Sequence, residues 1–245
     1  MSIKTFMKII IFCLLGLTLI SFSVNLFGNL KQSNEQEKID YSQLTYVAFG
    51  DSLTASWEKV PNAYPELVAN SLGLKSFVNK GVHGATLSEN DAGRTNMTQT
   101  ILKYKAKADI ISVMLGTNDI GLSLPLGNIG DKTNSTFYGS LYLVSEHLTK
   151  NYPNSFVFYM TPFVNIYEYN GNLDFQGHSL NDFADAFRYY ANKYDFALLD
   201  MYNLSEFEKV DMLSAVSDGV HPSQEFTINY TAPKITQFIK DNYKK

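Results

Sequence analysis

From residue 44 onward, short apolar runs alternate with longer segments whose apolar residues recur at helical spacing. The run 109–115 is almost wholly apolar, as expected of a strand buried on both faces of a sheet. The segment 179–194 instead places Phe183, Phe187 and Tyr190 on one side of a helix. The pattern predicts strands over 44–49, 76–79, 109–115, 156–160 and 196–200. It predicts helices over 63–72, 97–108, 136–152, 179–194 and 224–243.

The alternation of five strands with helices predicts an α/β fold. Such an order is typical of a parallel sheet that carries helices on both faces. In these sheets ligands bind beyond the carboxyl ends of the strands. The junctions that follow the predicted strands are therefore the places in which to look for chemistry.

The first 30 residues have the pattern of an export segment. Two lysines precede an apolar run over 9–20, and no acidic residue occurs in 1–30. We expect 1–30 to be either a cleaved signal peptide or an uncleaved membrane anchor, with the following domain secreted or anchored on the outside. Residues 31–43 are then a polar spacer, and 44–245 form one domain.

Composition excludes several classes of protein. With 45% hydrophobic residues the chain can bury a core, which excludes a disordered chain. A formal net charge of −4 without a basic cluster argues against nucleic acid as a partner. The single cysteine, Cys13, cannot form an internal disulfide, and no histidines have metal-ligand spacing. We expect a monomer with no metal and no cofactor.

Three junctions carry residues that catalysis could use. Ser52 follows the first predicted strand, where a helix N-terminus can face developing negative charge. Asn118 follows the third strand, and its amide can donate to an oxyanion. Asp218 precedes His221 by three residues, and histidine is the natural general base near neutral pH. Each residue also has an ordinary interpretation, as a helix cap, a turn residue or a solvated surface group.

Together the motifs resemble those of a known family. GDSLT at 50–54, GVHGAT at 81–86, GTND at 116–119 and DGVHP at 218–222 are similar to the four blocks of the SGNH, or GDSL, esterase/lipase superfamily, in the same order. This resemblance implies a flavodoxin-like three-layer α/β/α fold. The GxSxG nucleophile elbow of the α/β-hydrolases is absent.

The resemblance also implies a role for each site residue. Ser52 corresponds to the nucleophile, His221 to the general base, and Asp218 to the group that orients His221. The oxyanion hole would consist of the backbone N–H groups of Ser52 and Gly84 and the side-chain amide of Asn118. The first glycine of the GVHGAT motif is expected to fill a turn position instead.

The substrate is less well specified by the sequence. The connections 121–136 and 163–178 are long and rich in turn residues, and Tyr167 and Tyr169 suit stacking against a sugar. Neither connection is apolar enough to predict a cleft for a long acyl chain. We therefore expect a small-molecule or glycan ester, with short acyl groups such as acetyl on extracellular carbohydrate. The alternatives are a lipase or lysophospholipase, an acyltransferase that uses the same triad, and a non-catalytic binding module.

Overall fold

The computed structural model describes residues 39–165, 168, 170–204, 215–216 and 218–244. From Tyr41 onward these residues belong to one compact unit, Tyr41–Lys245. The predicted signal or anchor over 1–30 lies outside the described residues, as does most of the predicted spacer. Within the described ranges no helix is both long and apolar enough to cross a bilayer.

The core of the molecule is a parallel sheet of five strands in the order β2-β1-β3-β4-β5. The strands are β1 (Thr45–Gly50), β2 (Ser76–Gly81), β3 (Ile110–Met114), β4 (Phe156–Met160) and β5 (Ala197–Leu199). All five match predicted strands, so the α/β prediction is confirmed. The order reverses between β1 and β3, and the carboxyl ends beside such a reversal are the usual ligand site.

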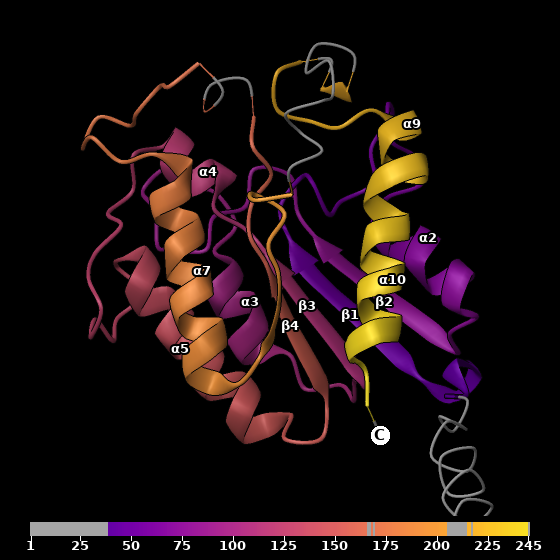
Figure 1. Ribbon diagram of the computed structural model, residues 1–245. Coiled ribbons are helices and arrows are strands. Elements are labelled where there is room, and N and C mark those ends of the chain that lie inside the picture. Colours follow the sequence, from indigo (N-terminus) through magenta and orange to yellow (C-terminus); the bar gives the residue numbers. More distant parts are fainter. Residues whose placement is uncertain (1–38, 166–167, 169, 205–214, 217, 245) are drawn as a thin grey trace, which may run out of the picture. The chain divides into compact units, whose positions relative to one another are not determined.

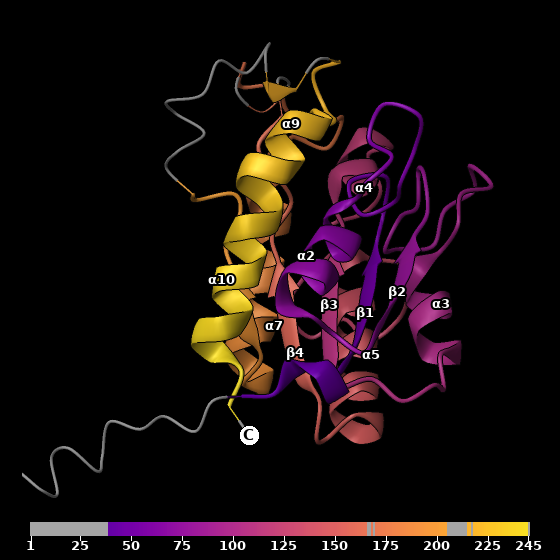
Figure 2. The same cartoon turned by 90° about the vertical axis from the view of Figure 1, so that its right-hand side faces the viewer.

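Helices cover both faces of the sheet and complete three layers (Figures 1 and 2). On one face lie α2 (Tyr64–Leu72) and α10 (Ala232–Asn242), which contact each other. On the other lie α3 (Met97–Lys103), α5 (Phe137–Asn151) and α7 (Leu180–Tyr194). The remaining elements are short: η1 (Tyr41–Gln43), α4 (Thr117–Gly121), α9 (Gln224–Phe226) and the π-helical turn η3 (Thr227–Thr231).

The larger helices begin and end where the sequence supplies caps. Ser179 and Asp182 form a capping box at the start of α7, each side chain bonding the backbone N–H of the other. Thr136 caps α5 by accepting from the N–H of Gly139. Gly73 ends α2 with φ of 66°, a left-handed conformation that glycine adopts without strain. These local signals explain why the predicted helix bounds are close to the observed ones.

Two predicted helices differ from the structure. The helix expected over 97–108 ends at Lys103, because Tyr104 turns to an extended conformation. In this conformation the ring of Tyr104 packs edge-on against that of Phe49, with 5.4 Å between the ring centroids. The helix expected over 224–243 contains the five-residue π turn η3 between α9 and α10.

Candidate active site

Ser52 lies in a tight turn that follows β1. The backbone N–H groups of Thr54 and Ala55 both donate to the carbonyl oxygen of Asp51, which closes the turn. The side chain of Asp51 accepts from the N–H of Leu53 at 2.9 Å. A Cβ atom on Gly50 would lie 1.9 Å from Thr54 Oγ1, so only glycine fits there. The turn thereby fixes Ser52 at the carboxyl edge of the sheet.

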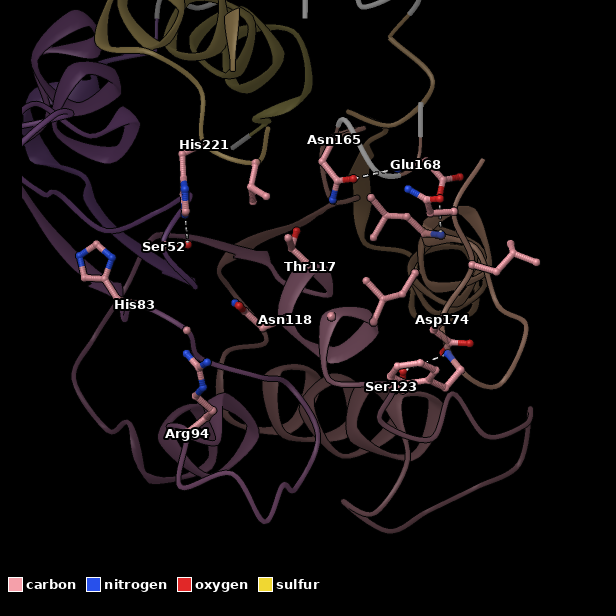
Figure 3. A pocket seen from close by; sticks show the side chains of 18 residues that line it. Ser52, His83, Arg94, Thr117, Asn118, Ser123, Asn165, Glu168, Asp174 and His221 are labelled. Carbon is pink, nitrogen blue, oxygen red and sulfur yellow. Dashed lines mark hydrogen bonds between the residues drawn. The ribbon is translucent and has the colours of Figure 1, made fainter. Parts of the chain in front are cut away.

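Ser52, His221 and Asp218 form a continuous line of hydrogen bonds. Figure 3 shows the part of it between Ser52 and His221. Ser52 Oγ lies 2.8 Å from His221 Nε2, although 169 positions separate the two residues in the chain. His221 Nδ1 lies 2.7 Å from Asp218 Oδ2. With Nδ1 protonated toward the carboxylate, Nε2 is free to accept the serine proton. The structure thus brings together the three residues that the sequence singled out.

The Asp218 carboxylate is held in its charged form. Partial burial by itself would raise the pKa of Asp218. Hydrogen bonds from His221, both backbone N–H and ring, and from the Val220 N–H outweigh that effect and lower the pKa to about 2. Asp218 is therefore anionic at neutral pH, where it can stabilise a positive charge on His221.

Gly84 and Asn118 lie on the wall of the cavity beside Ser52. Gly84 has φ of 68°, which a residue with a Cβ adopts only with strain. Gly81 does not line the cavity; a Cβ there would lie 2.4 Å from the backbone nitrogen of Ala55. Asn118 Nδ2 donates to Ala85 O at 3.0 Å and lies 3.4 Å from Asp51 Oδ2.

Two fully buried carboxylates support this wall. Asp119 accepts the backbone N–H groups of Leu87 at 3.0 Å and Ser88 at 2.9 Å, which ties the loop after Gly84 to α4. Burial raises the pKa of Asp119 to about 6, against the effect of these bonds. Burial also raises the pKa of Asp51 to about 7, and the nearby charge of Asp119 adds to the shift.

A cavity of about 640 Å³ opens beside Ser52 and runs toward α4 and α7. Its wall includes the apolar residues Ile120, Leu173, Phe175, Leu180 and Val220, beside the polar residues Asn165, Glu168, Asn172 and Asp174. These apolar residues come from separate segments, so no single loop predicted an apolar cleft. Tyr167 and Tyr169, expected to stack on a sugar, lie outside the described residues.

Comparison with known proteins decides the family. Residues 48–226 match the GDSL-like lipase/acylhydrolase family. The chain belongs to this family. No curated protein matches the sequence.

Solved structures of low sequence identity share the fold of this GDSL-like domain. A protein of Lactobacillus plantarum is 22% identical, with a TM-score of 0.74 over 84% of this chain and 100% of that one. A lipase/acylhydrolase from Enterococcus faecalis is 20% identical, with a TM-score of 0.60 over 82% and 98% of the two chains. A variant of an acetyl-xylooligosaccharide esterase from Geobacillus is 16% identical, with a TM-score of 0.60 over 84% and 98%. They confirm the predicted three-layer fold.

Three further residues of the GDSL-like domain reach the site, of which Trp57 and Arg94 lie outside the four motifs and Thr117 lies in the GTND motif without having been singled out. The ring of Trp57 packs against that of His221, with centroids 5.4 Å apart. Arg94 and Thr117 line the cavity, and Thr117 Oγ1 is buried without a hydrogen bond among the described residues. Their positions depend on loop geometry, which no local pattern shows. In the described part of the chain, no group of three or more His, Cys, Asp or Glu side chains could hold a metal ion.

Proposed function

We propose that this chain is a serine esterase that hydrolyses carboxylic esters through an acyl intermediate on Ser52. The observation that carries the proposal is the hydrogen-bonded line from Ser52 Oγ to His221 and Asp218, at 2.8 and 2.7 Å. A hydroxyl bonded to an oriented imidazole is the arrangement that activates a serine nucleophile. Membership of the GDSL-like lipase/acylhydrolase family supports the same chemistry.

In the acylation step, Ser52 Oγ forms a bond to the ester carbonyl carbon while His221 Nε2 takes the hydroxyl proton. The carbonyl electron pair moves to oxygen, and Asp218 stabilises the imidazolium. The bond to the alcohol oxygen then breaks, and His221 returns the proton to the leaving alcohol. Water attacks the acyl-enzyme with His221 again as base, which releases the acid and regenerates Ser52.

The oxyanion would be held by the backbone N–H groups of Ser52 and Gly84 and by the amide of Asn118. Of the two Asn118 amide hydrogens, Ala85 O takes one at 3.0 Å. The other faces Asp51 Oδ2 at 3.4 Å, the limit of a hydrogen bond. A substrate oxyanion would have to replace this long bond in order to accept that second hydrogen.

The substrates we propose are short-acyl esters of carbohydrate outside the cell, in keeping with the export segment expected over 1–30. One observation favours a second candidate. The cavity wall carries several apolar side chains, and about 640 Å³ is more space than an acetyl group fills. Longer acyl esters, as a lipase or lysophospholipase would take, could place their chain against Ile120 and Leu180.

Turnover of p-nitrophenyl acetate, butyrate and octanoate by the full chain, beside Ser52→Ala, tests the function. We expect hydrolysis that requires Ser52 and labelling of Ser52 by an organophosphonate. Rates that fall with chain length support short-acyl substrates, and rates that rise support the lipase candidate. Turnover that survives in Ser52→Ala, or labelling of that variant, would show that another residue is the nucleophile.

A further inference from the structure

The cavity beside Ser52 holds a positive charge next to Gly84. The side chain of Arg94 lines this cavity (Figure 3), and its guanidinium lies beside Gly84. The contact is close, because a Cβ atom added to Gly84 would lie 2.1 Å from Arg94 Nη1. A glycine at this position thus leaves room for the guanidinium beside the nucleophile.

Arg94 forms no ion pair among the described residues. The chain has one other arginine, Arg188, and its guanidinium bonds Asp185 at 2.6 Å and Asp200 at 2.8 Å. A guanidinium carries five N–H donors in a fork that matches a carboxylate or phosphate. In Arg94 this fork faces the cavity with no acidic partner on the described part of the protein.

The backbone of Arg94 is fixed by the fold. Its N–H donates to Asn90 Oδ1 at 2.9 Å, and Asn90 Nδ2 donates to its carbonyl oxygen at 3.2 Å. The next residue, Thr95, accepts the N–H of Thr86 at 3.0 Å. Thr86 lies two residues after Gly84, so the loops carrying Arg94 and Gly84 are joined. Such bracing holds the backbone of Arg94 beside the Gly84 loop, while the residue itself is exposed to solvent.

The acidic side chains of the cavity wall lie on its other side and are engaged by protein groups (Figure 3). Glu168 accepts the N–H of Leu180 and the hydroxyl of Tyr202. Asp174 accepts the N–H groups of Gln176 and His178 at 2.8 Å. These acids therefore do not neutralise the Arg94 end of the cavity.

We propose that Arg94 is a specificity-determining residue that binds an anionic group of the substrate, a carboxylate or a phosphate, a few bonds from the scissile ester. The inference rests on the proposed esterase function and narrows its substrate class to anionic esters. The anion could be the carboxylate of an acidic sugar or the phosphate of a lipid or polyol. In either case the guanidinium would bind it with charge-assisted hydrogen bonds.

Matched pairs of esters test this proposal. 4-Acetoxybenzoate and 4-acetoxyphenyl phosphate carry the anion on the alcohol side, and methyl 4-acetoxybenzoate is their neutral counterpart. The monoanionic 4-nitrophenyl ester of adipic acid and its methyl ester test the acyl side. Each is assayed with the wild-type full chain, Arg94→Gln and Arg94→Lys. Lys150→Gln, at the far end of α5 and exposed, removes a positive charge away from the site and serves as control.

We expect Arg94→Gln to lower kcat/KM for at least one anionic ester by about tenfold or more, since a charge-assisted hydrogen bond has about this effect. The neutral counterpart should change less than about threefold, and Arg94→Lys should recover part of the loss. Lys150→Gln should match the wild type. A stronger effect on phosphate points to a lipid or polyol phosphate, and one on carboxylate points to an acidic sugar.

An equal loss on neutral and anionic esters in Arg94→Gln would overturn the proposal, because Arg94 would then support the oxyanion and not the substrate. Unchanged rates on every ester would overturn it as well. Failure of the esterase function itself is a different result, since neutral esters would then show no turnover that depends on Ser52.

Discussion

His221 is held on three sides. Asp218 bonds its Nδ1 at 2.7 Å, Ser52 bonds its Nε2 at 2.8 Å, and the ring of Trp57 packs against it. Asp218 in turn accepts two backbone N–H groups of its own loop, and these bonds fix the shape of the short segment from Asp218 to His221. A ring fixed in this way is ready to take a proton without a costly search of rotamers.

Replacing Asp218 by Asn is expected to lower kcat by about 10³–10⁴, because an amide favours the wrong imidazole tautomer. The loop should keep its shape, since Asn still offers an oxygen to the N–H groups of Val220 and His221. With its pKa at about 2, the wild-type carboxylate is charged from about pH 5 upward, so the loss should appear across that range. Initial rates between about pH 5 and 9 measure it. Recovery of the wild-type kcat at any of these pH values would contradict an orienting role for Asp218.

Asn118→Ala is expected to lower kcat by about 10²–10³, the usual effect of losing one oxyanion donor. Asn172→Ala is the matched control, because Asn172 is exposed on the wall of the same cavity. The control should keep near wild-type kcat, and both variants should unfold at similar urea concentrations. Near-normal turnover by Asn118→Ala would remove this amide from the oxyanion site.

At the scale of elements, the site is assembled from turns and loops after strands that are neighbours in the sheet. The Ser52 turn follows β1, the Gly84 loop follows β2, and Asn118 lies in the first turn of α4, after β3. The buried carboxylate of Asp119 ties the Gly84 loop to α4, and that of Asp51 lies 3.4 Å from the amide nitrogen of Asn118. A small change of backbone conformation in one of these loops should therefore lower the catalytic rate while the fold is retained.

Gly84→Ala tests this, with Gly73→Ala as its control. Both glycines have nearly the same positive φ, 68° and 66°, so both substitutions should destabilise the protein by about 1–2 kcal/mol. Only at Gly84 does the added Cβ meet another group, Arg94 Nη1, whereas Gly73 has nothing within 4 Å. We expect kcat/KM to fall at least tenfold in Gly84→Ala alone. Urea unfolding and ester turnover of both variants measure the two effects, and equal activities would contradict a catalytic position for Gly84.

At the scale of the whole molecule, two ionisable groups lie in an interior without a positive partner among the described residues. Asp51 and Asp119 are fully buried, and burial raises the pKa of Asp51 to about 7 and that of Asp119 to about 6. Between about pH 4 and 7 the native protein keeps protons that the unfolded chain releases. The stability contributed by these two groups is therefore present below about pH 4 and is lost as pH rises toward 7. Because the pKa of Asp218 is lowered, the stability that this group contributes is lost as pH falls below about 4, the opposite direction to Asp51 and Asp119.

Asp51→Asn should remove the larger part of this pH dependence. For the wild-type protein we expect the free energy of unfolding to fall between about pH 5 and 8. In the variant the fall should be smaller, with a gain on the order of 2 kcal/mol at pH 8 because no charge is buried at this position. Urea unfolding at the two pH values measures it. If the free energy of unfolding depends on pH equally in wild type and variant, Asp51 is charged in the native as well as in the unfolded protein.

The sequence by itself determined the elements and the candidates for chemistry. Strands such as β3 and helices such as α7 follow from apolar runs, periodicity and caps, all of which act between residues close in the chain. Ser52, Asn118 and His221 were identified because short motifs surround them. Only the tertiary structure decided how these parts meet. The 2.8 Å contact between Ser52 and His221 spans 169 positions. The positions of Arg94 and Trp57, and the apolar part of the cavity wall, depend on side chains from separate loops and helices, which no local pattern can bring together.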